Sequence, residues 1–430
     1  MAIEFNLNDI CDMKILLSED SDKKTEIMNK LKLTEKHWLI NSEYYHTIKY
    51  NKSKLTSDSY STSGKLRSII YKNNKILAFS PPKSIDYNDF NNKYDLNSCY
   101  TEDFIEGTMI NLFYDHDIDT WVYATKSCVG ANVYFFNPNT KCNLNNKEDN
   151  KEDNTLKNKT FGEMFLEVCE ASNINFDLFP KEYSYNFVFQ HPENRIVIPI
   201  TKMYLYLVRV YSINNEHYTI TEVNKEEIIN TINCQQVGDT IQRFLYWPNA
   251  YAIYNIEELK NNVESKNMPY NILGIMIYSP DGTRTKLRNP NYEEIRQLRG
   301  NQAKLQYQYL VLRQNGKMND FLLYYPEYKK MFSLYREQLH RYTDTLFNNY
   351  IKCFIKKEMK LGAFPHDYKT HMFNLHKYYL DELREKKLSI NKIIVQNYVN
   401  NVHPALLMYT LNYNKRKHYM DQKICDSIGM

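Results

Sequence analysis

Residues 183–210 read YSYNFVFQHPENRIVIPITKMYLYLVRV, and this stretch decides the fold class. Aromatic residues recur at Tyr185, Phe187 and Phe189 with other residues between them. A period of two with aromatic and β-branched side chains is typical of strands in a half-buried sheet. We therefore predict strands over YSYNFVFQ (183–190), RIVIPI (195–200) and YLYLVRVYSI (204–213).

The same pattern extends outward on both sides of this stretch, from about residue 61 to residue 309. Further predicted strands are LRSIIY (66–71), KILAFS (75–80), GTMINLFYD (107–115), TWVYATKS (120–127), ANVYFF (131–136) and NILGIMIYS (271–279). Alternation in so many short segments favours an antiparallel sheet. One segment, TFGEMFLEVCEAS (160–172), instead has helical spacing, and we expect it to bury Phe161, Phe165 and Val168 against the sheet.

The periodicity changes after about residue 320, where helical spacing begins. Apolar residues at three- and four-residue steps predict one long helix, with members Met331, Tyr335, Leu339, Tyr342, Leu346, Tyr350 and Phe354. Gly362 and Pro365 would end it. A second helix carries Met372, Leu375, Tyr379 and Leu383. Ser389 is the predicted N-cap of a third helix, and Pro404 begins a fourth.

These patterns predict an α+β fold with an antiparallel core followed by an all-helical C-terminal domain. The predicted divisions are an irregular, partly helical N-terminal segment (1–60), the core domain (61–312) and the helical domain (313–430). Residues 137–159 contain the tandem repeat NKEDNKED. Such a polar, repetitive stretch predicts a disordered surface insert.

Charge and composition exclude some classes of protein. The net charge is +4, and residues 313–430 hold 20 Lys/Arg against 11 Asp/Glu, which suits either a polyanionic partner or a solvated helical surface. The eight cysteines lack C-x-x-C spacing, and His371 and His376 are five apart, so we predict no metal site. Without a signal-peptide pattern or an apolar run of about 20 residues, we expect a soluble cytoplasmic protein with no membrane partner.

A hairpin near the end of the core domain carries the clearest chemical signal, in the sequence NILGIMIYSPDGTRTKLRN. Asp281 and Gly282 form a turn signal between two strands. On the second strand, Arg284, Lys286 and Arg288 are two residues apart and therefore project from one face. Three cations on one face indicate either a phosphate-binding strand or an exposed, solvated one.

The order of these segments over about residues 64–310 resembles the phage-type ATP-dependent RNA ligases, members of the lysine-dependent nucleotidyltransferase superfamily. YNFVFQHPENRIVIPI is similar to their Phe-Glu-Phe-Val-x-Pro-x-Asn-Arg-Ile-Val segment, and YLYLVRV to the strand behind the nucleotide base. GIMIY and TKLRN resemble the last two motifs, LRSIIY the segment before the nucleophile, and IEGTMI the end of the nucleophile motif. The resemblance and the composition suggest a large DNA virus of protists as the source.

The resemblance implies a lysine that attacks ATP with magnesium, holds AMP and activates an RNA 5′-phosphate for joining to a 3′-hydroxyl. Of the family's nucleotide- and phosphate-binding residues, four have counterparts here, namely Arg67, Glu106, Lys286 and Arg288. Three family positions are lost. Phe104 stands where the nucleophilic lysine is expected, and Val188 and Leu273 stand where glutamates are expected.

Three hypotheses for the function follow. The first is a catalytically degenerate ligase-like protein that binds RNA or a nucleotide. The second is an active ATP- and magnesium-dependent RNA ligase with a relocated nucleophile, for which Lys126 and Lys83 are the candidates, although surface or phosphate-facing lysines are the simpler interpretation. The third is a scaffold that binds protein partners through its Tyr-rich C-terminal helices. An aromatic content of 14% serves base stacking and protein contacts equally well.

Overall fold

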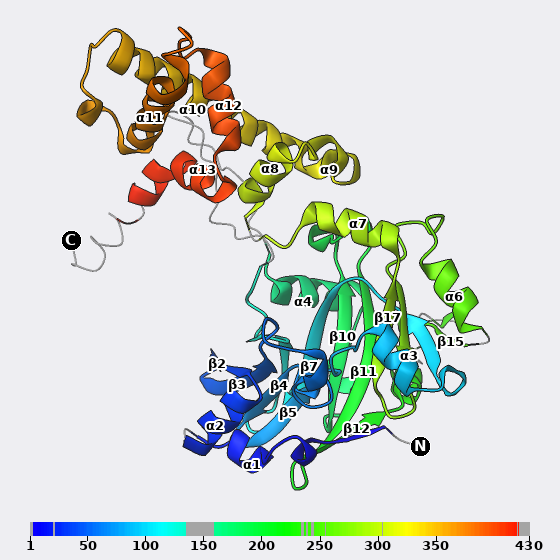
Figure 1. The fold of residues 1–430 in the computed structure, drawn as a ribbon. Coiled ribbons are helices and arrows are strands. Elements are labelled where there is room, and N and C mark those ends of the chain that lie inside the picture. Colours follow the sequence, from blue (N-terminus) through cyan, green and yellow to red (C-terminus); the bar gives the residue numbers. More distant parts are fainter. Residues whose placement is uncertain are drawn as a thin grey trace. The chain divides into compact units, whose positions relative to one another are not determined.

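Figure 1 shows the computed structural model of the chain. The structure describes residues 3–19, 22–134, 159–233, 236–237, 240–241, 245–253, 255–302, 304–418 and 420. The predicted insert (137–159) lies outside these residues except for Lys159. The chain divides into two compact units, and the boundary between them lies after Arg296. The predicted boundary at residue 312 falls inside helix α8 (Leu305–Gln314).

The first unit is built on a seven-stranded antiparallel sheet, with β10 near its centre. The order is β1 (Glu4–Asn6), β12 (Thr219–Val223), β11 (Tyr204–Asn214), β10 (Tyr183–Gln190), β7 (Thr108–Asp115), β8 (Thr120–Thr125) and β9 (Cys128–Val129). Phe187 of β10 lies opposite Ile110 of β7 and Leu207 of β11. The two strands predicted over 183–190 and 204–213 are therefore confirmed as hydrogen-bonded neighbours.

One face of this sheet holds the largest apolar core of the unit. Tyr185, Phe187 and Phe189 are fully buried there and pack against helix α4 (Phe161–Ala171). Thr160 caps α4 in a capping box with Glu163, which explains why the helix starts at Phe161. Burial of Phe165 and Val168 confirms the predicted amphipathic helix, while Phe161 is only partly buried.

Two smaller antiparallel sheets complete the unit. One has the order β15 (Ala250–Ala252), β6 (Tyr100–Asp103), β16 (Gly274–Tyr278) and β17 (Arg284–Arg288). The other has the order β2 (Leu33–Ile40), β3 (Glu43–Tyr50), β4 (Ile69–Lys72) and β5 (Lys75–Phe79). The predicted turn between β16 and β17 is present, with Gly282 at φ +79°. A short ladder pairs β13 (Gln236–Val237) with β14 (Thr240–Ile241).

Short helices connect these strands. They are α1 (Met13–Leu16), α2 (Asp22–Lys30), α3 (Tyr87–Lys93), α5 (Lys225–Asn233) and α6 (Ile256–Val263). Helix α7 (Pro290–Arg299) follows β17, and the boundary between the two units falls within it. Residues 1–60 were predicted to be irregular and partly helical. The helices are there, but the β2–β3 hairpin and β1, which pairs with β12 through Phe5 and Ile220, show that this segment is also part of the sheets.

Two predicted strands are wrong. RIVIPI (195–200) forms a loop, because backbone N–H groups of Val197 and Ile198 are taken by the carboxylate of Glu106 instead of by a neighbouring strand. In ANVYFF, residues 131–134 are not a strand either, and residues 135–136 lie outside the described part. Ala131 has φ +50°, so the chain turns there instead of extending.

The second unit is helical in its described residues. Its helices are α8, α9 (Met318–Tyr324), α10 (Lys329–Tyr350), α11 (His366–Tyr378), α12 (Lys392–Asn401) and α13 (Pro404–Leu411), with π-helical turns at Ile351–Ile355 and Tyr379–Leu383. Five residues of the predicted stripe are buried: Tyr335, Leu339, Tyr342, Leu346 and Tyr350. Thus the α+β class with an antiparallel core and a helical C-terminal region is confirmed.

Helix boundaries in this unit agree with the sequence in part. Pro404 begins α13 as predicted. The predicted N-cap Ser389 is wrong, because the side chain of Asn391 accepts from the N–H of Ile394 and caps α12. Among the described helices, none combines the length and the apolarity that crossing a membrane requires.

Candidate functional site

Two cations of strand β17, Arg284 and Lys286, contact one loop, residues 81–84. Arg284 is buried, and its guanidinium donates to the carbonyl oxygens of Pro82 (2.9 Å) and Pro81 (3.1 Å). The ammonium of Lys286 donates to the Ser84 hydroxyl at 3.1 Å. The strand is therefore packed against this loop and is not a freely solvated one.

Cations from two other segments meet the same loop. Arg67, just before β4, donates to the carbonyl oxygen of Pro81 at 3.3 Å. Lys83 lies in the loop itself, where its ammonium donates to the carbonyl oxygen of Ser84 (2.7 Å) and lies 4.8 Å from the ring centre of Tyr60. Segments that are far apart in the sequence thus bring their positive charges to one place.

Three lysines in this region have lowered pKa values, and in each case burial and neighbouring cations are the causes. Burial, followed by the charges of Arg288 and Lys83, lowers the pKa of Lys286 to about 7. Burial, followed by the charge of Arg67, lowers the pKa of Lys126 to about 8. The pKa of Lys83 is lowered by burial and by Arg67. Each shift has the sign expected for a cation placed among cations with little solvent.

We call this set the cationic cluster, and its members are Arg67, Lys83, Lys126, Arg284, Lys286 and Arg288. Among the described residues, Arg288 is the one member with a carboxylate within 4.0 Å, that of Glu293 at 2.9 Å. The other five positive charges have no such counter-ion in the part of the chain that the structure describes. A bound anion would relieve their mutual repulsion, and a phosphate is the anion that such arrays of Lys and Arg bind best.

Of the residues singled out from the sequence, Arg67, Lys83 and Lys286 meet at the 81–84 loop. Arg288 lies two residues beyond Lys286 on β17, and Lys126 is linked to the group through the charge of Arg67. Lys126 follows β8, in the turn to β9, and not within a strand. Its neighbour Ser127 accepts a hydrogen bond from Lys49 at 2.6 Å.

The sixth predicted residue, Glu106, has a different environment. Its buried carboxylate accepts hydrogen bonds from the backbone N–H groups of Val197 (3.0 Å) and Ile198 (3.1 Å) and from the side chain of Tyr292. Burial raises its pKa, and these donors oppose the rise. Glu106 thus anchors the 195–200 loop, and its predicted contact with a nucleotide remains a prediction.

The three positions predicted to have lost the family's polar residues flank the segment around Glu106. Phe104 follows β6, donates its N–H to the carbonyl oxygen of Gly274 (3.1 Å), and has the guanidinium of Arg288 at 5.8 Å from its ring centre. Leu273 precedes Gly274 and is buried. Val188 lies on β10 next to Gly107. A Cβ atom added to Gly107 would lie only 2.7 Å from Cγ1 of Val188. Phe104 therefore lies beside Arg288 where a nucleophile was expected, and apolar Val188 and Leu273 occupy the two positions where carboxylates were expected.

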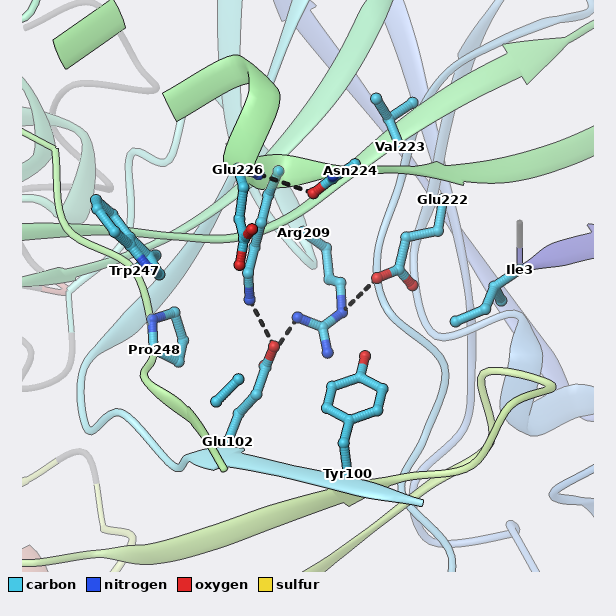
Figure 2. A pocket seen from close by; sticks show the side chains of 12 residues that line it. Ile3, Tyr100, Glu102, Arg209, Glu222, Val223, Asn224, Glu226, Trp247 and Pro248 are labelled. Atoms are coloured by element: carbon cyan, nitrogen blue, oxygen red, sulfur yellow. Dashed lines mark hydrogen bonds and ion pairs between the residues drawn. The ribbon is translucent and has the colours of Figure 1, made fainter. Parts of the chain in front are cut away.

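A cavity of about 380 Å³ lies elsewhere in the same unit, and none of the six cations lines it. Figure 2 shows Arg209 of β11 at its centre, between Glu102 (2.9 Å) and Glu222 (3.0 Å). The guanidinium also lies 4.1 Å from the ring centre of Tyr278, and Lys225 bonds to Glu102 at 2.6 Å.

The Arg209 network holds one unused donor. Arg209 is 2% exposed, and its Nη2 has no hydrogen-bond partner among the described residues. A buried, unsatisfied guanidinium N–H costs free energy, which a ligand oxygen would recover. Sequence reasoning missed this site, although a lone arginine among apolar residues in YLYLVRV was its signal.

Comparison with known proteins gives weak likenesses to ligases. No protein-family model matches the chain, and no curated protein matches it. Among solved structures, a mutant Naegleria gruberi RNA ligase with ATP and Mn is 7% identical with a TM-score of 0.30, covering 47% of this chain and 52% of that chain. The match therefore spans about half of that ligase.

Two further solved structures are ligases as well. An archaeal ATP-dependent RNA ligase is 9% identical (TM-score 0.35), covering 92% of this chain and 78% of that one. A putative ATP-dependent DNA ligase from Aquifex aeolicus is 12% identical (TM-score 0.35), covering 84% and 80%. Identities and TM-scores this low do not assign the chain to their family.

Proposed function

We propose that this chain is an RNA-ligase-like protein that binds RNA or a nucleotide through the cationic cluster without forming a covalent intermediate. The observation that carries the proposal is the meeting of five cations that have no carboxylate within 4.0 Å among the described residues. Desolvated positive charges bind phosphate more strongly than solvated ones, because less water must be displaced.

The absence of covalent chemistry is proposed from the side chains at the three lost family positions. Phe104 cannot form a phosphoramidate, and the apolar side chains of Val188 and Leu273 offer no oxygen to a metal ion. The carboxylate of Glu106 is already engaged by backbone N–H groups. ATP phosphates therefore fit the cluster, whereas magnesium does not fit the positions at which the family resemblance places its ligands.

RNA affinity and its salt dependence test this proposal. We expect Lys286→Glu and Arg288→Glu each to lower the affinity for single-stranded RNA at least about tenfold and to reduce the salt slope by about one. Lys75→Glu is the matched control, since Lys75 is an exposed lysine of the same unit, outside the cluster. Unchanged RNA affinity in both cluster variants would show that RNA binds elsewhere or not at all.

A second candidate function is active ligation through Lys126. The pKa of about 8 at Lys126 leaves a substantial neutral fraction of the amine near neutral pH, as a nucleophilic lysine requires. Incubation with α-labelled ATP and magnesium, followed by a denaturing gel, tests it. A labelled adduct that disappears in Lys126→Ala but persists in Lys83→Ala would establish Lys126 as the nucleophile, and the opposite pattern would select Lys83.

A further inference from the structure

Two histidines face each other across the β2–β3 hairpin, away from the residues discussed so far. His37 lies directly opposite His46 in the antiparallel register, and their Nδ1 atoms are 2.8 Å apart. Two nitrogens at this distance either share one proton or bind a common cation. The rings are nearly perpendicular, at 86°, with centroids 4.7 Å apart.

A carboxylate completes the group. Oε1 of Glu35 lies 3.5 Å from Nδ1 of His46, and one ligand atom from each of Glu35, His37 and His46 lies within 4.8 Å of the other two. Glu35 is two residues before His37, so both side chains project from the same face of β2.

The surroundings hold two of the three side chains in place. His46 stacks on Tyr71, with ring centroids 4.7 Å apart and planes 26° from parallel. The hydroxyl of Tyr71 donates to Glu35, so one tyrosine orients both groups. Outer hydrogen bonds of this kind are typical of metal ligands.

We propose that Glu35, His37 and His46 form a binding site for a divalent transition-metal ion of the zinc class. Two imidazoles and one carboxylate are a common ligand set for Zn²⁺. With bonds of about 2.0–2.1 Å in a tetrahedral site, ligand atoms lie about 3.4 Å apart. The observed separations of 2.8 and 3.5 Å lie on either side of that value. Water would supply the fourth ligand.

Lys24 gives the proposal a second, independent consequence. Its ammonium lies 3.0 Å from Oε1 of Glu35, where its charge competes with a metal ion for the carboxylate. Replacing Lys24 by Met removes the competing charge and keeps an unbranched apolar stem. The variant Lys24→Met should therefore bind metal more tightly than the wild type if Glu35 is a ligand.

Zn²⁺ titration of the full chain against a chelating dye tests the site. We expect one saturable site in the wild type and an affinity at least about 100-fold lower in His37→Ala and in His46→Ala. His217→Ala is the matched control, because His217 lies in the turn after β11, outside the group. His37 is exposed, so its variant should fold even if His46→Ala does not.

Co²⁺ substitution identifies the ligands independently of affinity. The expected visible spectrum has d–d bands of a nitrogen- and oxygen-ligated ion without a thiolate charge-transfer band, and it is lost in His37→Ala. No saturable Zn²⁺ binding by the wild type would overturn the proposal. Equal affinity in wild type and His37→Ala, or a thiolate band, would place the bound ion elsewhere and overturn it equally.

Discussion

Raising the pH should weaken RNA binding at the cationic cluster, because Lys286 loses its proton in the free protein first. Its pKa is lowered to about 7 by burial and neighbouring cations. A phosphate beside it favours the charged form and raises that pKa in the complex. The complex therefore holds a proton that the free protein lacks above pH 7, so binding takes up protons and becomes weaker as the pH rises.

The magnitude follows from that pKa. Above about pH 7, each further pH unit should weaken the binding free energy by up to about 1.4 kcal/mol, or about tenfold in affinity, as long as the complex stays protonated. Lys286 is partly exposed, so solvent screening makes this an upper limit. Below about pH 6 the lysine is charged in both states, and its contribution to the pH dependence should vanish.

Fluorescence anisotropy with an oligoadenylate at constant ionic strength measures this effect, because its phosphodiesters and bases do not titrate in the range. Lys286→Arg is the matched variant, since arginine stays protonated and should flatten the profile while retaining binding. The part that remains belongs to Lys126, whose pKa is about 8, and to Lys83, whose pKa is also lowered. Identical pH profiles for wild type and Lys286→Arg would refute the reasoning.

Three further predictions concern stability in urea. Glu106→Ala leaves the N–H groups of Val197 and Ile198 unsatisfied and should lower the free energy of unfolding by about 2–4 kcal/mol. Glu106→Gln should lower it less, and equal losses in the two variants would contradict the role of the charge. Arg209→Met should cost about 3–5 kcal/mol, because buried Glu102 loses a partner, and a loss below about 1 kcal/mol would contradict it. Asn391→Ala should cost about 1 kcal/mol, whereas Ser389→Ala should be nearly neutral, and the reverse order would contradict the observed cap.

The strands that could be predicted are those whose two faces differ in environment. Along β10, Tyr185, Phe187 and Phe189 enter the core, while Asn186 points away and donates to Asn111 at 2.7 Å. That contrast appears in the sequence as a period of two. The β2–β3 hairpin was missed because most of its residues are partly or fully exposed, which leaves little alternation to detect.

Predictions from local sequence were also wrong where a residue distant in sequence determines the backbone conformation. The run RIVIPI is as apolar as a strand, yet Val197 and Ile198 bind a carboxylate that lies 91 and 92 positions away in sequence. Both Ser389 and Asn391 are good N-cap residues, and the choice between them depends on where packing starts α12. Neither outcome is encoded within a few residues.

The cluster was only partly visible in the sequence for the same reason. The alternation of Arg284, Lys286 and Arg288 places three charges on one face from local geometry alone. Arg67 and Arg284 both donate to the 81–84 loop, from 14 and 202 positions away in sequence, and no local pattern specifies that meeting. The Arg209 network depends on strands β6, β11 and β12 meeting, which no local pattern specifies.

Photo-crosslinking of RNA to the full chain, followed by mass spectrometry of the crosslinked peptides, tests the central claim most directly. If the cationic cluster is the RNA site, crosslinks will map to peptides containing residues 81–84 and 284–288, and added polyphosphate will compete with them. Crosslinks confined to the basic residues 313–430 would contradict the account and place RNA binding on the helical unit.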